Sequence, residues 1–282
     1  MSESEPKIKI LVACHKADTN ICQDDTYMPI QVGKALHPEI DLGFQCDNTG
    51  DHISEKNDTY CELTALYWAW KNLKHIDYIG LCHYRRYFDF ANIGKNRHLI
   101  SYSSTPDSII FDESRIPTLL SPDSVIISSP FYYPYSLKTD YCLNHIKEDF
   151  DILEKVIKDE FPDYYPAFDK VINKGNKASL CNMFIMSWSN FDKYCEWLFE
   201  VLSKVEQQVK LSPYPYQRRV FGFMAERLLN VYLYHQKNNC TITYCPIKMI
   251  DECQSKTLKM KIHTQLSLNL KARINRDRNN KA

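Results

Sequence analysis

An amphipathic helix between two short apolar strands is the feature of this 282-residue sequence that most restricts its fold. Residues 7–14, Lys-Ile-Lys-Ile-Leu-Val-Ala-Cys, predict a buried strand. Residues 60–73 carry apolar side chains at helical spacing, and Thr59 with Glu62 has the pattern of a capping box. Residues 77–82 predict a further strand. Because a strand–helix–strand connection within one sheet is almost always a right-handed parallel crossover, the order predicts an α/β fold.

The rest of the pattern divides the chain into an α/β half and a mostly helical half. Further strands are predicted at residues 41–46, 121–129, 178–188 and 241–249, and helices at 138–158, 190–208 and 216–236. We therefore expect one domain over residues 1–250, with a nucleotide-binding α/β half at 7–130 and a mainly helical half at 131–250. Residues 251–282 are expected to form a basic C-terminal helix or tail.

Composition and charge exclude several classes of protein. No basic region precedes an apolar stretch at the N-terminus, so we expect no secretory signal, and no apolar run is long enough to span a bilayer. The 11 Cys are odd in number and contain no Cys-x-x-Cys pair, which argues against a disulfide framework or a structural zinc site and favours a reducing cytoplasm. Residues 256–282 hold eight Lys or Arg and one acid; because the net charge is zero, the body carries −7 and is a poor nucleic-acid binder.

The most unusual motif, His83-Tyr84-Arg85-Arg86-Tyr87-Phe88, follows the strand that ends at Cys82. Ligands of open α/β sheets bind beyond the carboxyl ends of the strands. The planar forks of Arg85 and Arg86 match phosphate oxygens, and His83 stands beside them. These three residues are therefore predicted to bind a phosphorylated ligand. The alternative is an exposed turn whose arginines pair with nearby carboxylates.

The loop at residues 47–57 also lies at the carboxyl edge of the predicted sheet. Asp47, Thr49, Asp51 and Asn57 offer oxygens and an amide that can bind ribose, base or sugar hydroxyl groups. The alternative is a turn whose side chains bond to their own backbone.

Candidate proton acceptors lie in the second half of the chain. His145 and Asp149 are four residues apart on a predicted helix, so they would share one face, and a histidine oriented by a carboxylate can act as a general base. Glu226 lies seven residues after Arg219, two turns along one helical face, and is the third candidate. Asn182 heads an apolar strand and needs partners if it is buried. Exposed helix surfaces are the alternative for His145, Asp149 and Arg219.

Several long motifs resemble a bacterial family of capsular polysaccharide or exopolysaccharide biosynthesis glycosyltransferases, long described as a domain of unknown function. The resemblance extends from about residue 7 to about residue 236. It is carried by Cys-Glu-Leu-Thr-Ala-Leu-Tyr-Trp-Ala-Trp-Lys-Asn at 61–72, Ile-Gly-Leu-Cys-His-Tyr-Arg-Arg-Tyr-Phe at 79–88, Asn-Met-Phe-Ile-Met at 182–186 and Arg-Val-Phe-Gly-Phe-Met-Ala-Glu-Arg at 219–227.

The resemblance implies a GT-A-like nucleotide-sugar-binding fold and transfer of a sugar from a UDP-sugar donor to a growing bacterial surface glycan. Galactofuranose or galactose is the expected sugar, and a glycan or lipid-linked oligosaccharide is the expected acceptor. Many GT-A enzymes carry an Asp-x-Asp metal site where this chain has His83-Tyr84-Arg85. We therefore expect no required cofactor, with Arg85 and Arg86 neutralising the diphosphate. If a divalent metal is needed, Asp47, Asp51 and His83 are the candidate ligands.

Two other functions fit the same pattern: a non-catalytic sugar-nucleotide or glycan-binding protein, and a scaffold of a polysaccharide assembly complex that binds no donor. The expected location is the cytoplasm. Leu266, Leu270 and Ile274 are four residues apart in the basic tail and can line one helical stripe. Such a helix can lie on the inner face of the plasma membrane. The alternative is a C-terminal helix docked on the body.

Overall fold

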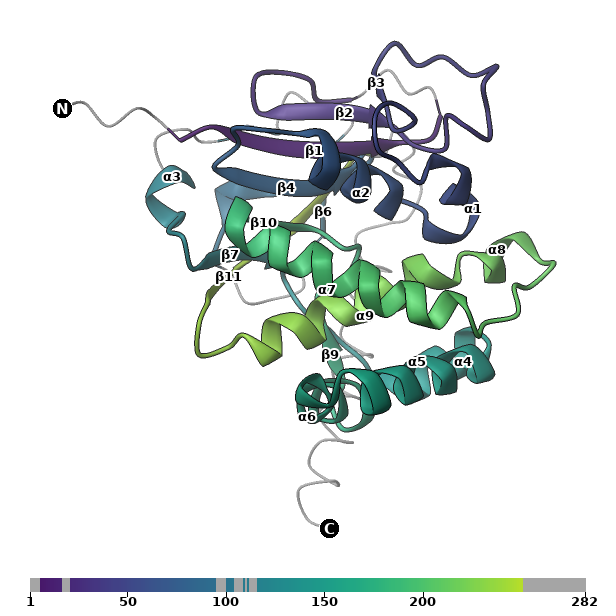
Figure 1. The fold of residues 1–282 in the computed structure, drawn as a ribbon. Coiled ribbons are helices and arrows are strands. Elements are labelled where there is room, and N and C mark those ends of the chain that lie inside the picture. Colours follow the sequence, from purple (N-terminus) through teal and green to yellow (C-terminus); the bar gives the residue numbers. More distant parts are fainter. Residues whose placement is uncertain are drawn as a thin grey trace.

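The computed structural model describes residues 6–16, 21–94, 100–103, 109, 111 and 116–250, which form a mixed α/β fold around one main sheet (Figure 1). The main path of the sheet has the order β11-β7-β10-β4-β1-β2-β3, in which only β10 runs antiparallel to its neighbours. These strands are β1 (Ile8–Cys14), β2 (Tyr27–Gln31), β3 (Gln45–Cys46), β4 (Tyr78–His83), β7 (Ser124–Ser128), β10 (Phe184–Ser187) and β11 (Thr241–Cys245). The predicted α/β class is confirmed.

Helices cover one face of the sheet in two layers (Figure 1). The helices are α2 (Leu63–Asn72), α4 (Leu137–Asn144), α5 (Lys147–Glu160), α7 (Trp188–Glu206) and α9 (Val220–His235). Alternate residues of a strand face opposite sides of a sheet. Leu11 of β1 and Leu81 of β4 accordingly pack in the core beneath the helices, whereas Ile10 and Val12 pack in a second core on the other face.

The second core is completed by three short strands that branch from the main path. They are β5 (Arg86–Phe88), β6 (Ile100–Ser103) and β12 (Ile247–Ile250), and β12 pairs with both of the others. β5 also forms a tight hairpin with β4, in which His83 lies opposite Arg86. This hairpin fixes the direction of the side chains at the end of β4.

Gly80 explains how the antiparallel strand β10 fits into the centre of the sheet. Gly80 lies opposite Ile185 of β10. A Cβ atom at position 80 would stand 2.8 Å from the Phe184 carbonyl oxygen and 2.9 Å from Cγ1 of Ile185. Real Cβ atoms do not approach other atoms so closely, so only glycine admits the β10 backbone at this distance.

The remaining elements are short. They are the helices α1 (Asn57–Tyr60), α3 (Ile116–Leu119), α6 (Tyr165–Phe168) and α8 (Pro215–Arg218), the paired strands β8 (Phe131–Tyr132) and β9 (Lys177–Ala178), and single turns at residues 54–56, 90–92, 162–164 and 169–173. α1 and α8 lie at the same side of the molecule, at the right in Figure 1. The parallel strands β1 and β4 run toward that side.

Several strands differ from the prediction. The strand predicted at residues 178–188 divides into β9 and β10, and the one at 241–249 divides into β11 and β12. Residues 27–31, which were not among the predicted strands, form β2 alongside β1. Their Tyr-Met-Pro-Ile-Gln sequence contains Pro29, which usually marks an edge or an interruption because it donates no ladder hydrogen bond. The strand predicted at residues 41–46 shrinks to Gln45–Cys46, because the residues before it form turns around Gly43.

Three helix predictions also differ. The helix predicted at 138–158 breaks into α4 and α5, because His145 has extended backbone angles of φ −137 and ψ −179. The helix at 216–236 breaks at Arg219 into α8 and α9. The capping box is wrong: Thr59 donates to the Lys56 carbonyl oxygen, and the Glu62 carboxylate makes no bond to the start of α2 but reaches Asn182.

The sheet crosses the division predicted at residue 130. β10 and β11 come from the second half of the chain, yet they pair with β4 and β7 of the first half. The basic tail at 251–282, with its predicted amphipathic stripe, lies outside the described residues. Across the described ranges, no helix combines the length and apolar composition needed to cross a membrane.

Candidate active site

A cavity of about 890 Å³ opens at the carboxyl ends of β1, β2 and β4, the position where open α/β sheets bind ligands. α1, the start of α2, α8 and the first turns of α9 complete its wall. The lining residues are Ala13, His15, Val32, His37, Ile40, Asn57, Asp58, Cys61, Glu62, His83, Tyr84, Arg86, Cys181, Pro215, Arg218, Arg219, Gly222, Phe223 and Glu226. Five of the predicted site residues are therefore brought to one cavity: Asn57, His83, Arg86, Arg219 and Glu226.

The β4–β5 hairpin separates the two neighbouring arginines of the central motif. Residues directly opposite on antiparallel strands project from the same face, so His83 and Arg86 both line the cavity. Arg85 occupies the turn and is exposed, with its guanidinium 5.2 Å from the Tyr84 ring centre. Arg85 is not among the cavity residues, so the structure brings only one of the two predicted arginines of this motif to the cavity.

Three guanidinium groups line the cavity, from Arg86, Arg218 and Arg219. Arg218 lies 3.7 Å from an Asp58 oxygen, and Arg219 donates from Nε to the Sγ atom of Cys61 at 3.2 Å. Among the residues that the structure describes, no hydrogen bond or ion pair to the Arg86 guanidinium is present. Arg86 is thus a cation at the start of β5, and its charge is left for an anionic ligand.

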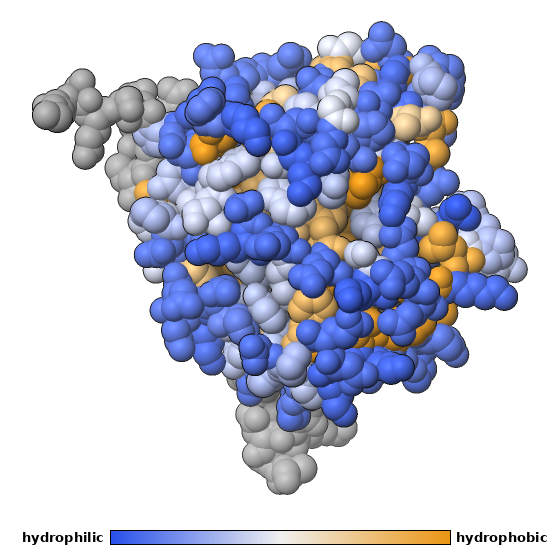
Figure 2. Space-filling view, viewed as in Figure 1, coloured by the Kyte–Doolittle hydropathy of each residue, from blue (hydrophilic) through white to orange (hydrophobic). Residues whose placement is uncertain are grey.

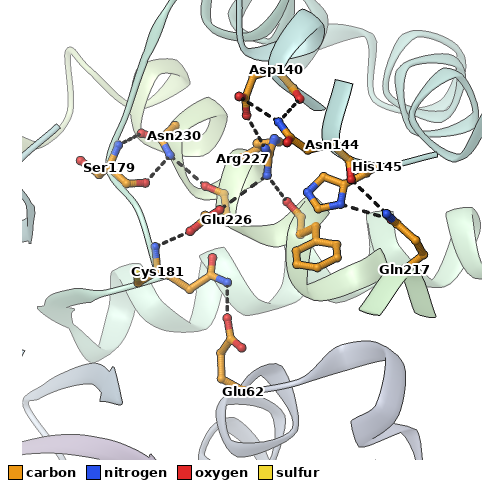
Figure 3. Close-up of polar contacts among 12 residues, drawn as sticks. Glu62, Asp140, Asn144, His145, Ser179, Cys181, Gln217, Glu226, Arg227 and Asn230 are labelled. Carbon is orange, nitrogen blue, oxygen red and sulfur yellow. Dashed lines mark hydrogen bonds and ion pairs between the residues drawn. The ribbon is translucent and has the colours of Figure 1, made fainter. Parts of the chain in front are cut away.

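Two carboxylates of the cavity hold a strained turn just before β10. Cys181 and Asn182 have positive φ angles of 69° and 50°, a region that costs free energy for residues other than glycine. The Cys181 amide donates to Oε1 of Glu226 at 2.5 Å, and Nδ2 of Asn182 donates to Oε1 of Glu62 at 2.7 Å. Figure 3 shows Glu226 above and Glu62 below this turn. The turn fixes both carboxylates in place, although they lie 164 residues apart along the chain.

Backbone strain is concentrated at this cavity. Four non-glycine residues in the described part of the chain have positive φ: Cys61, His75, Cys181 and Asn182. Cys61 and Cys181 line the cavity, and Asn182 bonds to cavity residue Glu62. Strained residues of this kind cluster at functional sites, because the surrounding contacts must enforce them.

His83 has a defined proton arrangement. Its Nε2 atom lies 2.6 Å from the Cys181 carbonyl oxygen, which can only accept, so Nε2 carries the hydrogen. Burial lowers the pKa of His83, against the nearby charge of Glu62, and keeps the ring neutral near pH 7. In this tautomer Nδ1 keeps a lone pair and can accept a hydrogen bond or a proton.

A buried ion pair between Arg227 and Asp140 lies above Glu226 in Figure 3, on the side away from the strained turn. Nη2 of Arg227 lies 3.1 Å from Oδ2 of Asp140, and Nη1 of Arg227 lies 3.5 Å from the second oxygen of Glu226. Asn230, one turn along α9 from Glu226, accepts from the Ser179 amide at 2.8 Å and donates to the Ser179 carbonyl at 3.0 Å. α9 therefore positions both Glu226 and the chain that leads into the strained turn.

His145 and Asp149, the other two predicted proton acceptors, do not line the cavity. Because the chain is extended at His145, the two residues do not share one helical face, and that prediction is wrong. The His145 ring stacks on Phe223 with 4.0 Å between centres, and burial, aided by the charge of Arg227, lowers its pKa to about 4. Asp149 is buried in the first turn of α5, and burial raises its pKa to about 6.

Most of the predicted loop residues bind within the protein. The buried Asp47 carboxylate accepts from the Gly33 and Lys34 amides and from the hydroxyl groups of Ser54 and Thr64. Thr49 accepts from the indole of Trp68, and the Asp51 backbone bonds to the side chain of Asn72. These three residues bond mainly to segments outside the loop, so the structure also differs from the alternative of a turn whose side chains bond to their own backbone. Of the predicted loop residues, only Asn57 lines the cavity.

Replacing Asp47 with alanine is expected to lower the free energy of unfolding by about 2–5 kcal/mol, because each buried donor left unpaired costs about 1–3 kcal/mol. Four donors lose their acceptor in this variant. Urea unfolding followed by circular dichroism measures the loss. Asp51→Ala, at an exposed position, is the control and should change stability by less than about 1 kcal/mol. Equal stability of the two variants would contradict a structural role for Asp47.

Several cavity residues were absent from the predicted site. Glu62 was interpreted as a capping residue, and its partner lies 120 residues away, so no local signal reveals its role. Arg218 also lines the cavity, but only its neighbour Arg219 was predicted as a site residue. His15 directly follows β1, so the strand-end rule that selected His83 would have selected it too.

No group of three or more His, Cys, Asp or Glu side chains that could hold a metal ion exists within the described residues. Of the three candidate ligands predicted for a metal, only His83 lines the cavity.

No curated protein matches the chain. A solved structure described as the WbbM bifunctional glycosyltransferase in its apo form matches with a TM-score of 0.74 and 26% sequence identity. The match covers 87% of this chain and 45% of that one, so this chain spans less than half the length of its relative.

The fold of the chain is therefore that of a region of a glycosyltransferase. A family model described as a domain of unknown function (DUF4422) matches residues 9–238, nearly the extent over which the sequence motifs indicate a family resemblance. That match includes every described residue of the cavity wall. The chain belongs to the DUF4422 family.

Proposed function

We propose that the cavity binds a nucleotide-diphosphate sugar and transfers its glycosyl unit to an acceptor hydroxyl group. The observation that carries this proposal is the Arg86 guanidinium, which lines the cavity at the start of β5, opposite His83, without an acidic partner among the described residues. The likeness to a glycosyltransferase over 87% of the chain supports the reaction class.

The arginines of the cavity supply the charge that the leaving group requires. When the bond between the sugar carbon and the diphosphate oxygen breaks, the electron pair leaves with the diphosphate. Guanidinium forks stabilise that developing charge by paired hydrogen bonds. Arg86, Arg218 and Arg219 line the same cavity and are assigned to this role.

Glu226 is assigned as the proton acceptor. In a direct displacement, the acceptor oxygen bonds to the sugar carbon and its proton passes to a base. Glu226 is the one of the three predicted bases that lines the cavity, and the Cys181 amide and Arg227 hold its two oxygens. Glu62, the second carboxylate of the wall, is the alternative base.

The finer assignments rest on the sequence resemblance. They are a UDP-sugar donor carrying galactofuranose or galactose, and a growing bacterial surface glycan or lipid-linked oligosaccharide as acceptor. A cytoplasmic location is proposed from the scattered cysteines, and contact of the basic tail with the inner membrane from its charge and apolar stripe. A non-catalytic sugar-nucleotide-binding protein is the second candidate function, favoured by the strained turn that already engages one oxygen each of Glu62 and Glu226.

Donor hydrolysis separates these functions. The protein is incubated with UDP-galactose, UDP-galactofuranose, UDP-glucose and UDP-N-acetylglucosamine, and released UDP is measured by chromatography. A transferase releases UDP slowly to water even without its acceptor. A binding protein retains affinity for a donor and releases none, and a scaffold neither binds nor releases.

Donor turnover is expected to persist in excess EDTA. Three guanidinium groups line the cavity and can neutralise the diphosphate without a divalent ion. The rate of UDP release is measured with EDTA, with added magnesium and with added manganese. Loss of activity in EDTA with recovery on adding either metal would contradict the assignment of charge neutralisation to arginine.

A further inference from the structure

An aromatic row leads from the cavity to the surface along α8. Phe223 lines the cavity, and its ring centre is 5.2 Å from that of Tyr216 and 4.0 Å from that of His145. Tyr216 is 57% exposed and Tyr214 is 71% exposed. Pro215, which stands between the two tyrosines, lines the cavity. The rim therefore carries exposed aromatic side chains directly beside the cavity.

These side chains are unusual for this surface. Of the six large hydrophobic side chains that are exposed in the described ranges, three belong to residues 211–216. The face seen in Figure 2 is mostly hydrophilic, and α8 lies at its right-hand edge, as the matching view of Figure 1 shows. Exposed aromatic side chains grouped at the mouth of a cavity indicate a binding surface.

The segment that carries the tyrosines is held rigidly. Gln217 donates from Nε2 to the Asn144 carbonyl oxygen at 3.0 Å, and its Oε1 atom lies 3.3 Å from Nδ1 of His145. Burial lowers the pKa of His145 to about 4, so its ring is neutral at pH 7 and stacks on Phe223 without bringing a charge to the row. A surface held in place before binding loses little conformational entropy when a ligand docks.

We propose that Tyr214 and Tyr216 form a subsite for the saccharide chain of the acceptor, with His145 and Phe223 as its support. This inference rests on the proposed function, because an acceptor hydroxyl must enter the cavity while the rest of the acceptor leaves across its rim. The C–H faces of sugar rings are weakly positive and apolar, and they complement the negative face of a tyrosine ring. The tyrosine hydroxyl groups can bond to the sugar hydroxyl groups beside them.

The composition of the segment favours a saccharide over a lipid surface. A helix that lies in a membrane needs a wide apolar face, whereas residues 211–216 offer one aliphatic side chain, Leu211. Arg218 of the same short helix is directed to Asp58 in the cavity wall. The aromatic row is continuous with the cavity through Phe223 and Pro215. A saccharide that reacts inside the cavity requires this continuity, because its chain must extend from the cavity onto the rim.

The test measures saccharide binding apart from catalysis. Wild-type protein, saturated with UDP, is titrated by NMR with defined oligosaccharides of galactose, glucose, rhamnose or N-acetylhexosamine. Tyr214→Ala is expected to raise the Kd of the tightest-binding oligosaccharide by at least about tenfold. Tyr214→Phe, which keeps the aromatic ring, should raise it by less than about threefold. Within the described ranges Tyr214 is the most exposed of the large hydrophobic side chains, so its replacement does not disturb the core.

Three outcomes would overturn the subsite. In the first, wild type and Tyr214→Ala bind the oligosaccharide with equal affinity. In the second, the wild type binds no oligosaccharide. In the third, Tyr214→Ala loses binding to phosphatidylglycerol vesicles but not to saccharide. Failure of the proposed function gives a different result: wild-type protein then releases no UDP from any of the nucleotide sugars. Oligosaccharide binding with no donor turnover would retain the subsite and reject the transferase.

Discussion

Arg86→Ala is expected to lower kcat/KM for the sugar-nucleotide donor by about 10- to 150-fold, whereas Arg85→Ala lowers it by less than about threefold. Removal of a hydrogen bond to a charged group costs about 1.5–3 kcal/mol, which gives the larger range. The neighbouring arginines differ because His83 and Arg86 are paired across the β4–β5 hairpin and face the cavity, while Arg85 lies exposed in the turn. UDP release under subsaturating donor measures both values.

Two further variants sharpen this comparison. Arg86→Lys keeps the charge but loses the planar fork, so its kcat/KM should lie between those of wild type and Arg86→Ala. Arg219→Ala should also lower donor turnover, since Arg219 lines the cavity. Circular dichroism confirms that each variant is folded. If Arg85→Ala lost as much activity as Arg86→Ala, the assignment of the donor diphosphate to the cavity side of the hairpin would be wrong.

Glu226→Gln is expected to reduce glycosyl transfer by about 100-fold or more, the usual effect of losing a general base, while UDP affinity stays within about threefold. The amide keeps an oxygen that can accept from the Cys181 amide, so the strained turn is retained. Single-turnover transfer and UDP titration measure the two effects separately. Asp149→Asn is the control. Asp149 is buried but does not line the cavity, so this variant should transfer sugar at the wild-type rate.

Glu62, the second carboxylate of the cavity wall, tests whether the proton acceptor is Glu226 in particular. Glu62→Gln also keeps an oxygen on the side chain, but it can no longer offer a carboxylate to Asn182. Full activity of Glu226→Gln together with a 100-fold loss in Glu62→Gln would move the proton acceptor to Glu62. Full activity of both variants would contradict proton transfer to either carboxylate.

The elements that position the cavity follow from local sequence. β1 and β4 are short runs of apolar residues, and α2 has apolar side chains at helical spacing, so their type and order are predictable. Because the carboxyl ends of parallel strands meet at one edge, the sequence predicts that His83 and the two arginines after it lie there. In the structure His83 and Arg86 line the cavity at that edge, and Arg85 does not.

Other features depend on tertiary contacts that no local pattern encodes. Whether Arg85 or Arg86 faces the cavity is decided by the hairpin register, which β12 fixes by pairing with β5 from more than 150 residues away. Asp47 is an acidic residue in a polar loop, as ligand-binding residues often are, but its carboxylate accepts hydrogen bonds from four donors within the protein. The helical break at His145 turns a predicted base into a ring stacked on Phe223.

The central claim is that this cavity binds the diphosphate of a sugar nucleotide, and a crystal structure of the wild-type protein with UDP tests it most directly. We expect the diphosphate oxygens to lie about 3 Å from the Arg86 guanidinium and from that of Arg218 or Arg219, at the carboxyl ends of β1 and β4. A nucleotide bound elsewhere, or an empty cavity at saturating UDP, would contradict the account.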